Sequence, residues 1–245
     1  MVLYLPTDKV KAVFAPYQVQ VFIYVSFLIL TIMGTIKQGI LGGFSGKVGT
    51  VIGGSWKGIS YMRSQAQSVK NPQTTGQVNQ RTKFTIALAF LKPITEAIRV
   101  GFKLYAQKQT AFNAAMSYTL ANAISGTSSD DYALDYANAL ISRGSLNGAK
   151  NGAAAASNGN IVVSWDDNSG VASALATDLA IVAILNPDKE EAVADTTGAV
   201  RSAGTETIGL PADWVGDDVE VYLGFVSSDG KSVANSVYLG AVTVA

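Results

Sequence analysis

The chain has 245 residues, of which 48% are hydrophobic, so it is long enough to bury one large core or two smaller ones. It contains no cysteine and no histidine, which excludes disulfides, thiol nucleophiles, imidazole bases and zinc sites built from these residues. Because no convergent set of other reactive groups can be named, we expect a protein that is not an enzyme and that binds no cofactor.

The formal net charge is zero, but the charges are divided along the chain. Residues 1–110 contain thirteen Lys and Arg and two acidic residues, a balance of 13 − 2 = +11. Residues 111–245 contain five Lys and Arg and sixteen acidic residues, a balance of 5 − 16 = −11. This asymmetry suggests a polyanionic partner for the basic half, or contacts between basic and acidic halves within one copy or between copies.

The first segment, residues 1–32, is an apolar extension. No charged residue occurs between Lys11 and Lys37, and Val19–Ile32 is the apolar centre of this stretch. We favour Met33 as the natural start over a signal-anchor helix within residues 12–36, and a cleaved signal peptide comes third because no small-x-small site follows. With Met33 as the start, the protein is expected to be cytoplasmic or virion-like. With residues 1–32 present, it would be membrane-anchored or exported, as a surface or adhesion module.

Glycine is frequent in residues 42–58, GGFSGKVGTVIGGSWKG, which invites comparison with a phosphate-binding loop. The comparison fails because Gly46 and Lys47 are followed by Val48, where the loop needs Ser or Thr, and because Leu41 stands where its first glycine is required. The β-branched and aromatic residues that follow favour strands. The stretch therefore predicts no nucleotide site.

It predicts instead a β-hairpin with strands at about Lys47–Ile52 and Trp56–Arg63 and a turn at residues 53–55, because Gly-Gly is a strong turn signal. An isolated hairpin is marginally stable in water, so it must dock on the following helices or on a neighbouring copy. Basic and aromatic side chains in this region are candidate contacts with a protein partner or a single-stranded polyanion. They are Lys47, Trp56, Lys57, Tyr61, Arg63, Lys70, Arg81 and Lys83.

Three helical stretches follow a turn at Asn71-Pro72. Thr74 or Thr75 is suited to cap the first helix, which ends or bends at Pro93. The second and third stretches are expected at about Ile94–Leu104 and Gln109–Ile124. We expect their aromatic side chains to lie in a core.

Four segments carry a resemblance to an uncharacterised bacterial family, DUF6266: QGILGGFSGKVGTVIGGSWKGISYMRS, NPQTTGQVNQRTKF, AFNAAMSYTLANAISG and DYANALISRGSL. The likeness runs from about Met33 to Leu146 and on towards the end of the chain, and similar members begin at a Met-Gly that matches Met33-Gly34. The NP-x-T…Q…R-x-x-F pattern is also similar to phage-type structural proteins with immunoglobulin-like tails. The resemblance implies an assembly or virion-like role and supplies no catalytic residues.

After residue 146 the composition changes. Residues 147–160, NGAKNGAAAASNGN, are interpreted as a linker or long loop. Short apolar runs then recur about every ten residues and predict an antiparallel sandwich, in which Trp165 and Tyr222 are core residues. Without a disulfide, a fibronectin type III module fits better than an immunoglobulin domain. Pairs of acidic residues such as Asp166 and Asp167 lie in predicted turns and match no calcium loop.

The sequence as a whole predicts an α+β, multi-part chain: a glycine-rich β-hairpin with helices, followed by an all-β sandwich of the fibronectin III or immunoglobulin type. The expected parts are an apolar extension (1–32), a basic hairpin and helical module (33–146) and an acidic sandwich (147–245). The leading hypothesis is a structural or assembly protein that contacts itself or another assembly protein. The alternatives are nucleic-acid or polyanion binding by the basic module and membrane-anchored adhesion.

Overall fold

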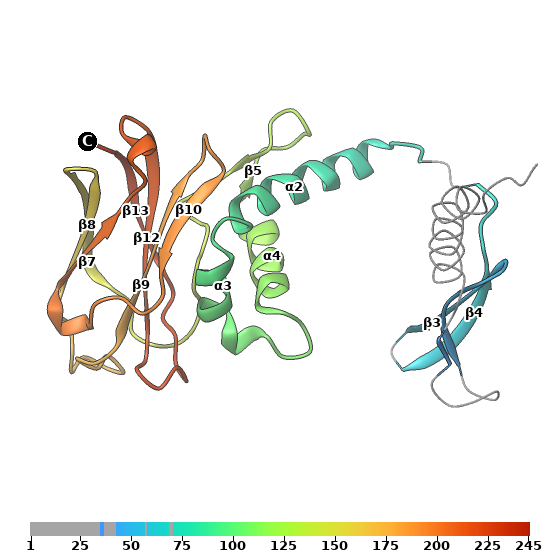
Figure 1. Cartoon of the computed structure of the whole chain (residues 1–245), viewed down its shortest axis with the longest axis horizontal. Helices are drawn as coiled ribbons and strands as arrows, with labels where there is room; N and C mark the ends of the chain where they lie inside the picture. The colour runs from blue at the N-terminus through green and yellow to red at the C-terminus, as the bar shows by residue number, and fades with distance from the viewer. Residues whose placement is uncertain (1–34, 37–42, 57, 69–70) are drawn as a thin grey trace, which may run out of the picture. The chain divides into compact units, whose positions relative to one another are not determined.

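The computed structural model describes residues 35–36, 43–56, 58–68 and 71–245. The chain forms two compact units, residues 1–72 and residues 73–245 (Figure 1). Within the described residues the class is mixed α+β, as the sequence predicted. The apolar extension proposed for residues 1–32 lies outside the described residues.

The described residues of the first unit form an antiparallel sheet whose strands follow each other in chain order. The predicted turn at residues 53–55 is wrong, because these residues lie inside a strand. The chain reverses instead around Gly49 and Gly58, whose positive φ angles of 59° and 85° suit a glycine. The strands are β1 (Thr35–Ile36), β2 (Phe44–Val48), β3 (Val51–Trp56) and β4 (Ile59–Ser64).

The glycines inside β3 leave space for aromatic rings. A Cβ atom added to Gly53 would lie 2.6 Å from the ring of Phe44, and one added to Gly54 would lie 3.0 Å from the ring of Tyr61. The Gly-Gly pair therefore serves close packing rather than chain reversal.

The second unit begins with helices whose ends follow ordinary capping chemistry. Thr74 caps the first helix through a reciprocal capping box with Gln77, in which each side chain accepts a hydrogen bond from the other residue's backbone N–H. Thr110 caps the last helix by accepting from the N–H of Asn113. The helical elements are α2 (Thr75–Leu91), α3 (Thr95–Gly101), η3 (Lys103–Tyr105) and α4 (Ala111–Asn122), followed by the short strands β5 (Ile124–Ser125) and β6 (Ala133–Leu134).

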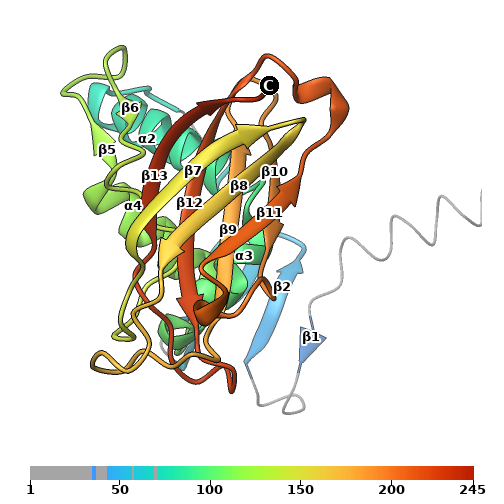
Figure 2. The same ribbon diagram turned by 90° about the vertical axis from the view of Figure 1, so that its left-hand side faces the viewer.

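Two antiparallel sheets make up the rest of this unit (Figure 2). One has the strand order β11-β8-β7 and the other β10-β9-β12-β13. The strands are β7 (Lys150–Ser157), β8 (Asn160–Asp166), β9 (Leu179–Asn186), β10 (Glu191–Asp195), β11 (Thr205–Gly209), β12 (Asp218–Val226) and β13 (Val237–Thr243), with short 3-10 turns η4 (Arg201–Ala203) and η5 (Ala212–Trp214).

Helices, four-stranded sheet and three-stranded sheet form successive layers (Figures 1 and 2). Val182 and Ile184 of β9 face the core between the two sheets, where they meet Trp165 of β8. Ile181 and Ala183 of the same strand face the helices. Strand β9 is therefore apolar at nearly every position instead of alternating, because both of its faces are covered. Trp165 and Tyr222 are buried core residues, as the sequence predicted.

The observed structure differs from the sequence-based prediction in one predicted linker and in the place where the chain divides. Residues 147–160 were expected to be a linker, but most of them form β7, whose alanines alternate between half-buried and exposed against β8. Alanine is depleted in strands and gives no strong strand signal, so the sequence did not indicate β7. The helices also share a core with β9 and β12, and the compact division of the chain falls at Pro72 rather than near residue 146.

Candidate functional site

Four of the predicted contact residues lie on one face of the first unit's sheet. Lys47 pairs with Ile52, and Ile52 pairs with Arg63. Trp56 lies four residues after Ile52 on its strand, and Tyr61 lies two residues before Arg63. Because alternate residues of a strand point to the same face, these basic and aromatic side chains share one face, here called the basic hairpin face.

The other predicted contacts are not brought into this face. Lys57 and Lys70 lie outside the described residues. Arg81 and Lys83 belong to α2 in the second unit, where the Lys83 ammonium lies 4.5 Å from the ring centroid of Tyr132. The sequence thus grouped residues that the fold divides between two units.

The hairpin sheet also exposes large apolar side chains on both faces. Trp56, Ile59 and Met62 are 69%, 71% and 70% exposed, and every residue of β4, an edge strand, is exposed. We name the whole set the apolar hairpin surface: Val48, Val51, Trp56, Ile59, Tyr61 and Met62. Of these, Trp56, Ile59 and Tyr61 lie on the basic hairpin face, whereas Val48, Val51 and Met62 lie on the opposite face.

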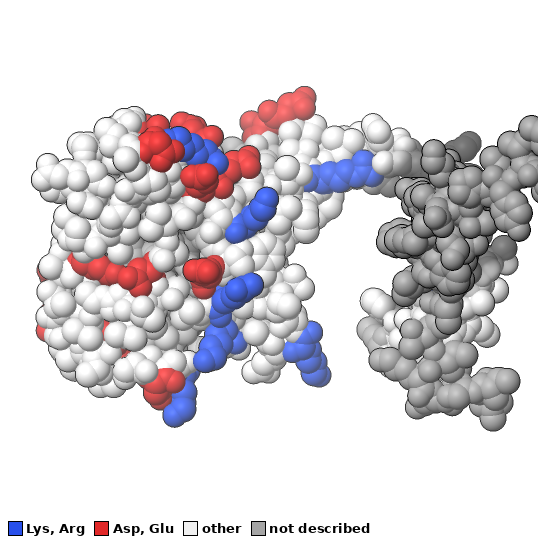
Figure 3. All heavy atoms as spheres, in the orientation of Figure 1, with Lys and Arg blue, Asp and Glu red and all other residues white. Residues whose placement is uncertain are grey.

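In the second unit, charge is segregated between layers (Figure 3). Residues 75–122, which form the helices, contain six Lys and Arg and one acidic residue, a balance of 6 − 1 = +5. Residues 147–245, which form the two sheets, contain four Lys and Arg and thirteen acidic residues, a balance of 4 − 13 = −9. The sequence-level division of charge therefore reappears within this one unit, as a basic layer of helices beside acidic sheets.

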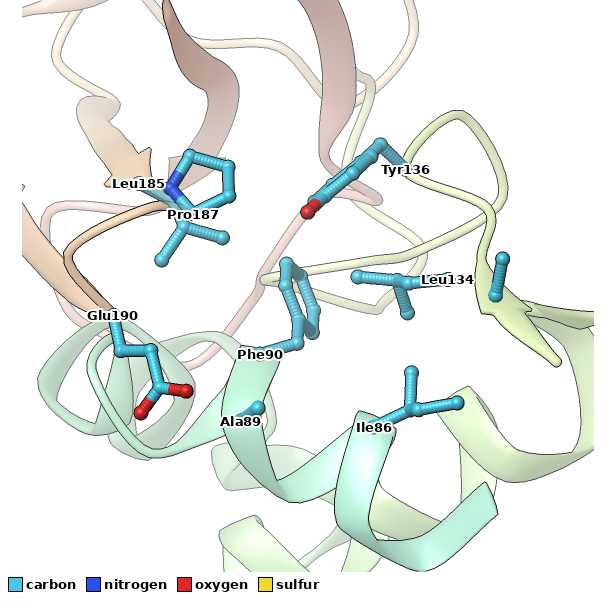
Figure 4. Close-up of a pocket in the computed structure, with 9 residues that line it drawn as sticks. Ile86, Ala89, Phe90, Leu134, Tyr136, Leu185, Pro187 and Glu190 are labelled. Atoms are coloured by element: carbon cyan, nitrogen blue, oxygen red, sulfur yellow. The ribbon is translucent and has the colours of Figure 1, made fainter. Parts of the chain in front are cut away.

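An apolar pocket of about 270 Å³ lies where α2, β6 and the end of β9 meet (Figure 4). Phe90, Leu134 and Leu185 line its interior, and Glu190 lies at its edge. Tyr136 also lines it, and the pKa of Tyr136 is raised mainly by burial and then by the negative charge of Glu220. The pocket residues come from distant parts of the chain, so no local sequence pattern could have predicted it.

The sequence also gave no sign of a buried ion pair inside the sandwich. The Arg201 Nε donates to Asp178 Oδ2 at 3.1 Å, and both side chains are fully buried. The guanidinium also donates to Asn168 Oδ1 and to the carbonyl oxygens of Gly148 and Asn147. These contacts hold loops together within the protein, and the network is structural.

Neither a metal site nor a membrane span occurs in the part of the chain that the structure describes. No cluster of three or more acidic side chains there could hold a metal ion. No helix there combines the length and the apolar composition needed to cross a membrane.

Comparisons with curated proteins and with solved structures gave no significant match. A family model did match, and it covers most of the described residues, from just before β2 into the last strand, β13. The chain belongs to the family of unknown function DUF6266, whose model matches residues 43–240.

Proposed function

We propose that this chain is a non-enzymatic structural or assembly protein, of phage or prophage type, that associates with further copies of itself through its hairpin unit. The observation that carries the proposal is the apolar hairpin surface, six large side chains exposed on a thin antiparallel sheet. A small sheet of this kind is marginally stable unless its apolar side chains are covered.

Covering these side chains would stabilise a complex substantially. Burial of an exposed side chain of the size of Trp56, Ile59 or Met62 contributes about 1.5–3 kcal/mol. The edge strand β4 adds backbone groups that can extend a sheet across a contact. The partner of the hairpin unit is therefore expected to be another protein, because a protein can cover the apolar side chains and also pair with the strand edge.

The charge distribution supports another copy of the chain as the partner of the apolar hairpin surface. Residues 33–72 contain five Lys and Arg and no acidic residue, whereas residues 147–245 have a balance of −9. A basic hairpin unit of one copy that meets the acidic sheets of another would form a head-to-tail contact, which can propagate into rings or filaments.

The sheet orders support the finer fold assignment, a fibronectin type III-like sandwich. In chain order, β7, β8 and β11 correspond to strands A, B and E, and β9, β10, β12 and β13 correspond to C, C′, F and G. Such a sandwich is compatible with many roles, so the functional proposal depends on the hairpin unit.

Light scattering after size-exclusion chromatography tests the proposal. The full chain and the chain that starts at Met33 are compared at low and high salt. We expect a mass above that of a monomer at low salt, which falls at high salt. Trp56→Ser/Ile59→Ser should shift the mass towards the monomer, whereas Val171→Ser/Leu175→Ser, which changes two exposed apolar residues of the other unit, should not. A monomeric mass under all conditions contradicts self-association.

A second function, polyanion binding, is favoured by the basic hairpin face. Lys47 and Arg63 would contact phosphates while Trp56 and Tyr61 stack on bases, which suits a single strand. Fluorescence anisotropy with a labelled single-stranded oligonucleotide tests this. Lys47→Gln/Arg63→Gln should weaken binding and reduce its salt dependence, whereas Met62→Ser on the opposite face should not. No binding at low salt would exclude this function.

A further inference from the structure

We propose that the helical layer contains a binding site for a small flat organic anion, centred on Arg143. A cavity of about 300 Å³ lies beside η3 and α4, and its lining includes Phe102, Tyr105, Tyr118 and the side chain of Arg143. The cavity shares no lining residue with the apolar pocket of Figure 4.

The guanidinium of Arg143 is held against two aromatic rings. Its Cζ atom lies 4.6 Å from the ring centroid of Tyr105 and 5.1 Å from that of Tyr118. Among the described residues, the Arg143 side chain makes no ion pair and no hydrogen bond. Its N–H donors therefore point to no protein acceptor and are available to a ligand, and a guanidinium presents them in a planar fork that fits a carboxylate or a phosphate.

The backbone that carries Arg143 is fixed from two sides. The Arg143 N–H donates to the carbonyl oxygen of Gly101 at the end of α3. The preceding Ser142 donates from its hydroxyl to the carbonyl oxygen of Ala234 at 2.9 Å, and the Ile141 N–H donates to the hydroxyl oxygen of Ser236 at 2.9 Å. Because the segment is held by both layers, the site is formed before any ligand binds.

The remaining lining provides further polar contacts. Gln109 and Asn122 each donate one amide hydrogen bond to the carbonyl oxygens of Tyr105 and Tyr118, respectively, which leaves one amide N–H of each for another partner. The hydroxyl of Ser117 also lines the cavity. Aromatic rings with a cationic group and several amide or hydroxyl donors fit a flat organic body that carries one oxyanion.

The charge of the surrounding layer favours the same ligand class. Lys103 and Lys108 precede and follow Tyr105 in the chain, and the helices, residues 75–122, have a balance of +5. A positive field of this kind raises the local concentration of anions. Both carboxylates and phosphates satisfy this chemistry, so the experiment must separate them.

Calorimetric titration of the full chain with benzoate, phenyl phosphate, inorganic phosphate and benzyl alcohol tests the site. We expect benzoate or phenyl phosphate to bind more tightly than inorganic phosphate, which lacks the flat body, and than benzyl alcohol, which lacks the charge. The better of the two aryl anions identifies the preferred oxyanion. No measurable binding of either aryl anion overturns the proposal.

Two variants of Arg143 and one control variant localise the binding. Arg143→Gln should weaken it about tenfold or more, and Arg143→Lys should weaken it less because it keeps the charge but loses the fork. Arg99→Gln, which changes an exposed arginine of α3, should leave it unchanged. Equal binding by Arg143→Gln and the unmodified chain would overturn the assignment. If Arg143→Gln does not fold, the backbone amide NMR signals of Ser117 and Asn122 are followed while benzoate is added to the unmodified chain. Shifts of these signals support the site, and unchanged signals overturn the assignment.

Discussion

The hydroxyl of Tyr222 in β12 donates a hydrogen bond of 2.8 Å to the carbonyl oxygen of Tyr136. The two residues are separated by 86 positions in the chain, and the bond joins the four-stranded sheet to the segment that follows the helices. Burial, and secondarily the charge of Glu220, raises the pKa of Tyr222, so the phenol stays protonated and remains a donor at any ordinary pH. The contact fastens the helical layer to the sandwich.

Tyr222→Phe is expected to destabilise the protein by about 1–2 kcal/mol, because it leaves the partly buried Tyr136 carbonyl oxygen without its donor. Urea unfolding followed by circular dichroism measures the change. Tyr132→Phe removes a comparable hydroxyl that donates to Thr127 in an exposed turn, and it should cost less than about 0.5 kcal/mol. Equal costs for the two variants would show that the layers do not depend on the Tyr222 bond.

The buried Arg201–Asp178 pair leads to a second prediction. Arg201→Met leaves the Asp178 carboxylate buried without its charged partner and should cost about 3–5 kcal/mol in unfolding free energy. The double variant Arg201→Met/Asp178→Leu removes both charges and should recover a large part of that loss. Urea unfolding of the two variants provides the test. If the double variant is less stable than Arg201→Met, the buried carboxylate is not the source of the loss.

Glu206 in β11 leads to a pH-dependent prediction. It is 9% exposed, and burial, followed by the negative charge of Asp195, raises its pKa to about 7. At pH values between the ordinary carboxyl pKa and about 7, Glu206 therefore keeps its proton in the folded protein but has lost it in the unfolded chain. Stability from this group is fully present below the unfolded pKa and is lost as pH rises through about 7.

The loss is expected to reach at most about 3 kcal/mol, the equivalent of a shift of about 2.5 pKa units. Glu206→Gln cannot ionise and should be more stable than the unmodified chain at pH 8, with little difference at pH 4. Unfolding free energies at several pH values measure this divergence. Asp195→Asn removes the neighbouring charge and should move the midpoint to lower pH. Parallel pH curves for Glu206→Gln and the unmodified chain would contradict the raised pKa.

Sequence patterns predicted the helices and strands best where each element depends only on residues close to it in the chain. The helix cap, predicted at Thr74 or Thr75, and the apolar run that buries Trp165 depend on only a few residues, and both are observed, with Thr74 as the cap. The alanine-rich β7 was missed because its fit depends on a neighbouring strand. Gly53-Gly54 was assigned to a turn because the sequence cannot reveal that two rings lie over these residues.

The candidate site was predictable in part for the same reason. The basic and aromatic character of Lys47, Trp56, Tyr61 and Arg63 is visible in the sequence, but their common face follows only from the register of three strands. The Arg143 cavity gave no signal in the sequence, because Arg143 joins residues 102–122 only when the segment between β6 and β7 packs against the end of α3.

The contact between Gly101 and the segment before Arg143 leads to a last prediction. A Cβ atom added at Gly101 would lie 2.2 Å from the carbonyl oxygen of Ile141 and 2.7 Å from the Cα of Ser142. Both are backbone atoms of residues whose N–H groups donate to the hydroxyl oxygen of Ser236. Gly101→Ala should therefore force the backbone apart and cost about 1–3 kcal/mol.

Gly76 provides a matched control, because it is also helical but no atom lies within 4 Å of an added Cβ. Gly76→Ala should stabilise α2 by about 0.5–1 kcal/mol, since alanine restricts the unfolded chain and favours helix. Urea unfolding of both variants shows directly whether each substitution raises or lowers the free energy of unfolding. A stabilising effect of Gly101→Ala would show that the backbone of the segment carrying Arg143 moves readily. The anion site would then not be held in a fixed geometry before a ligand binds.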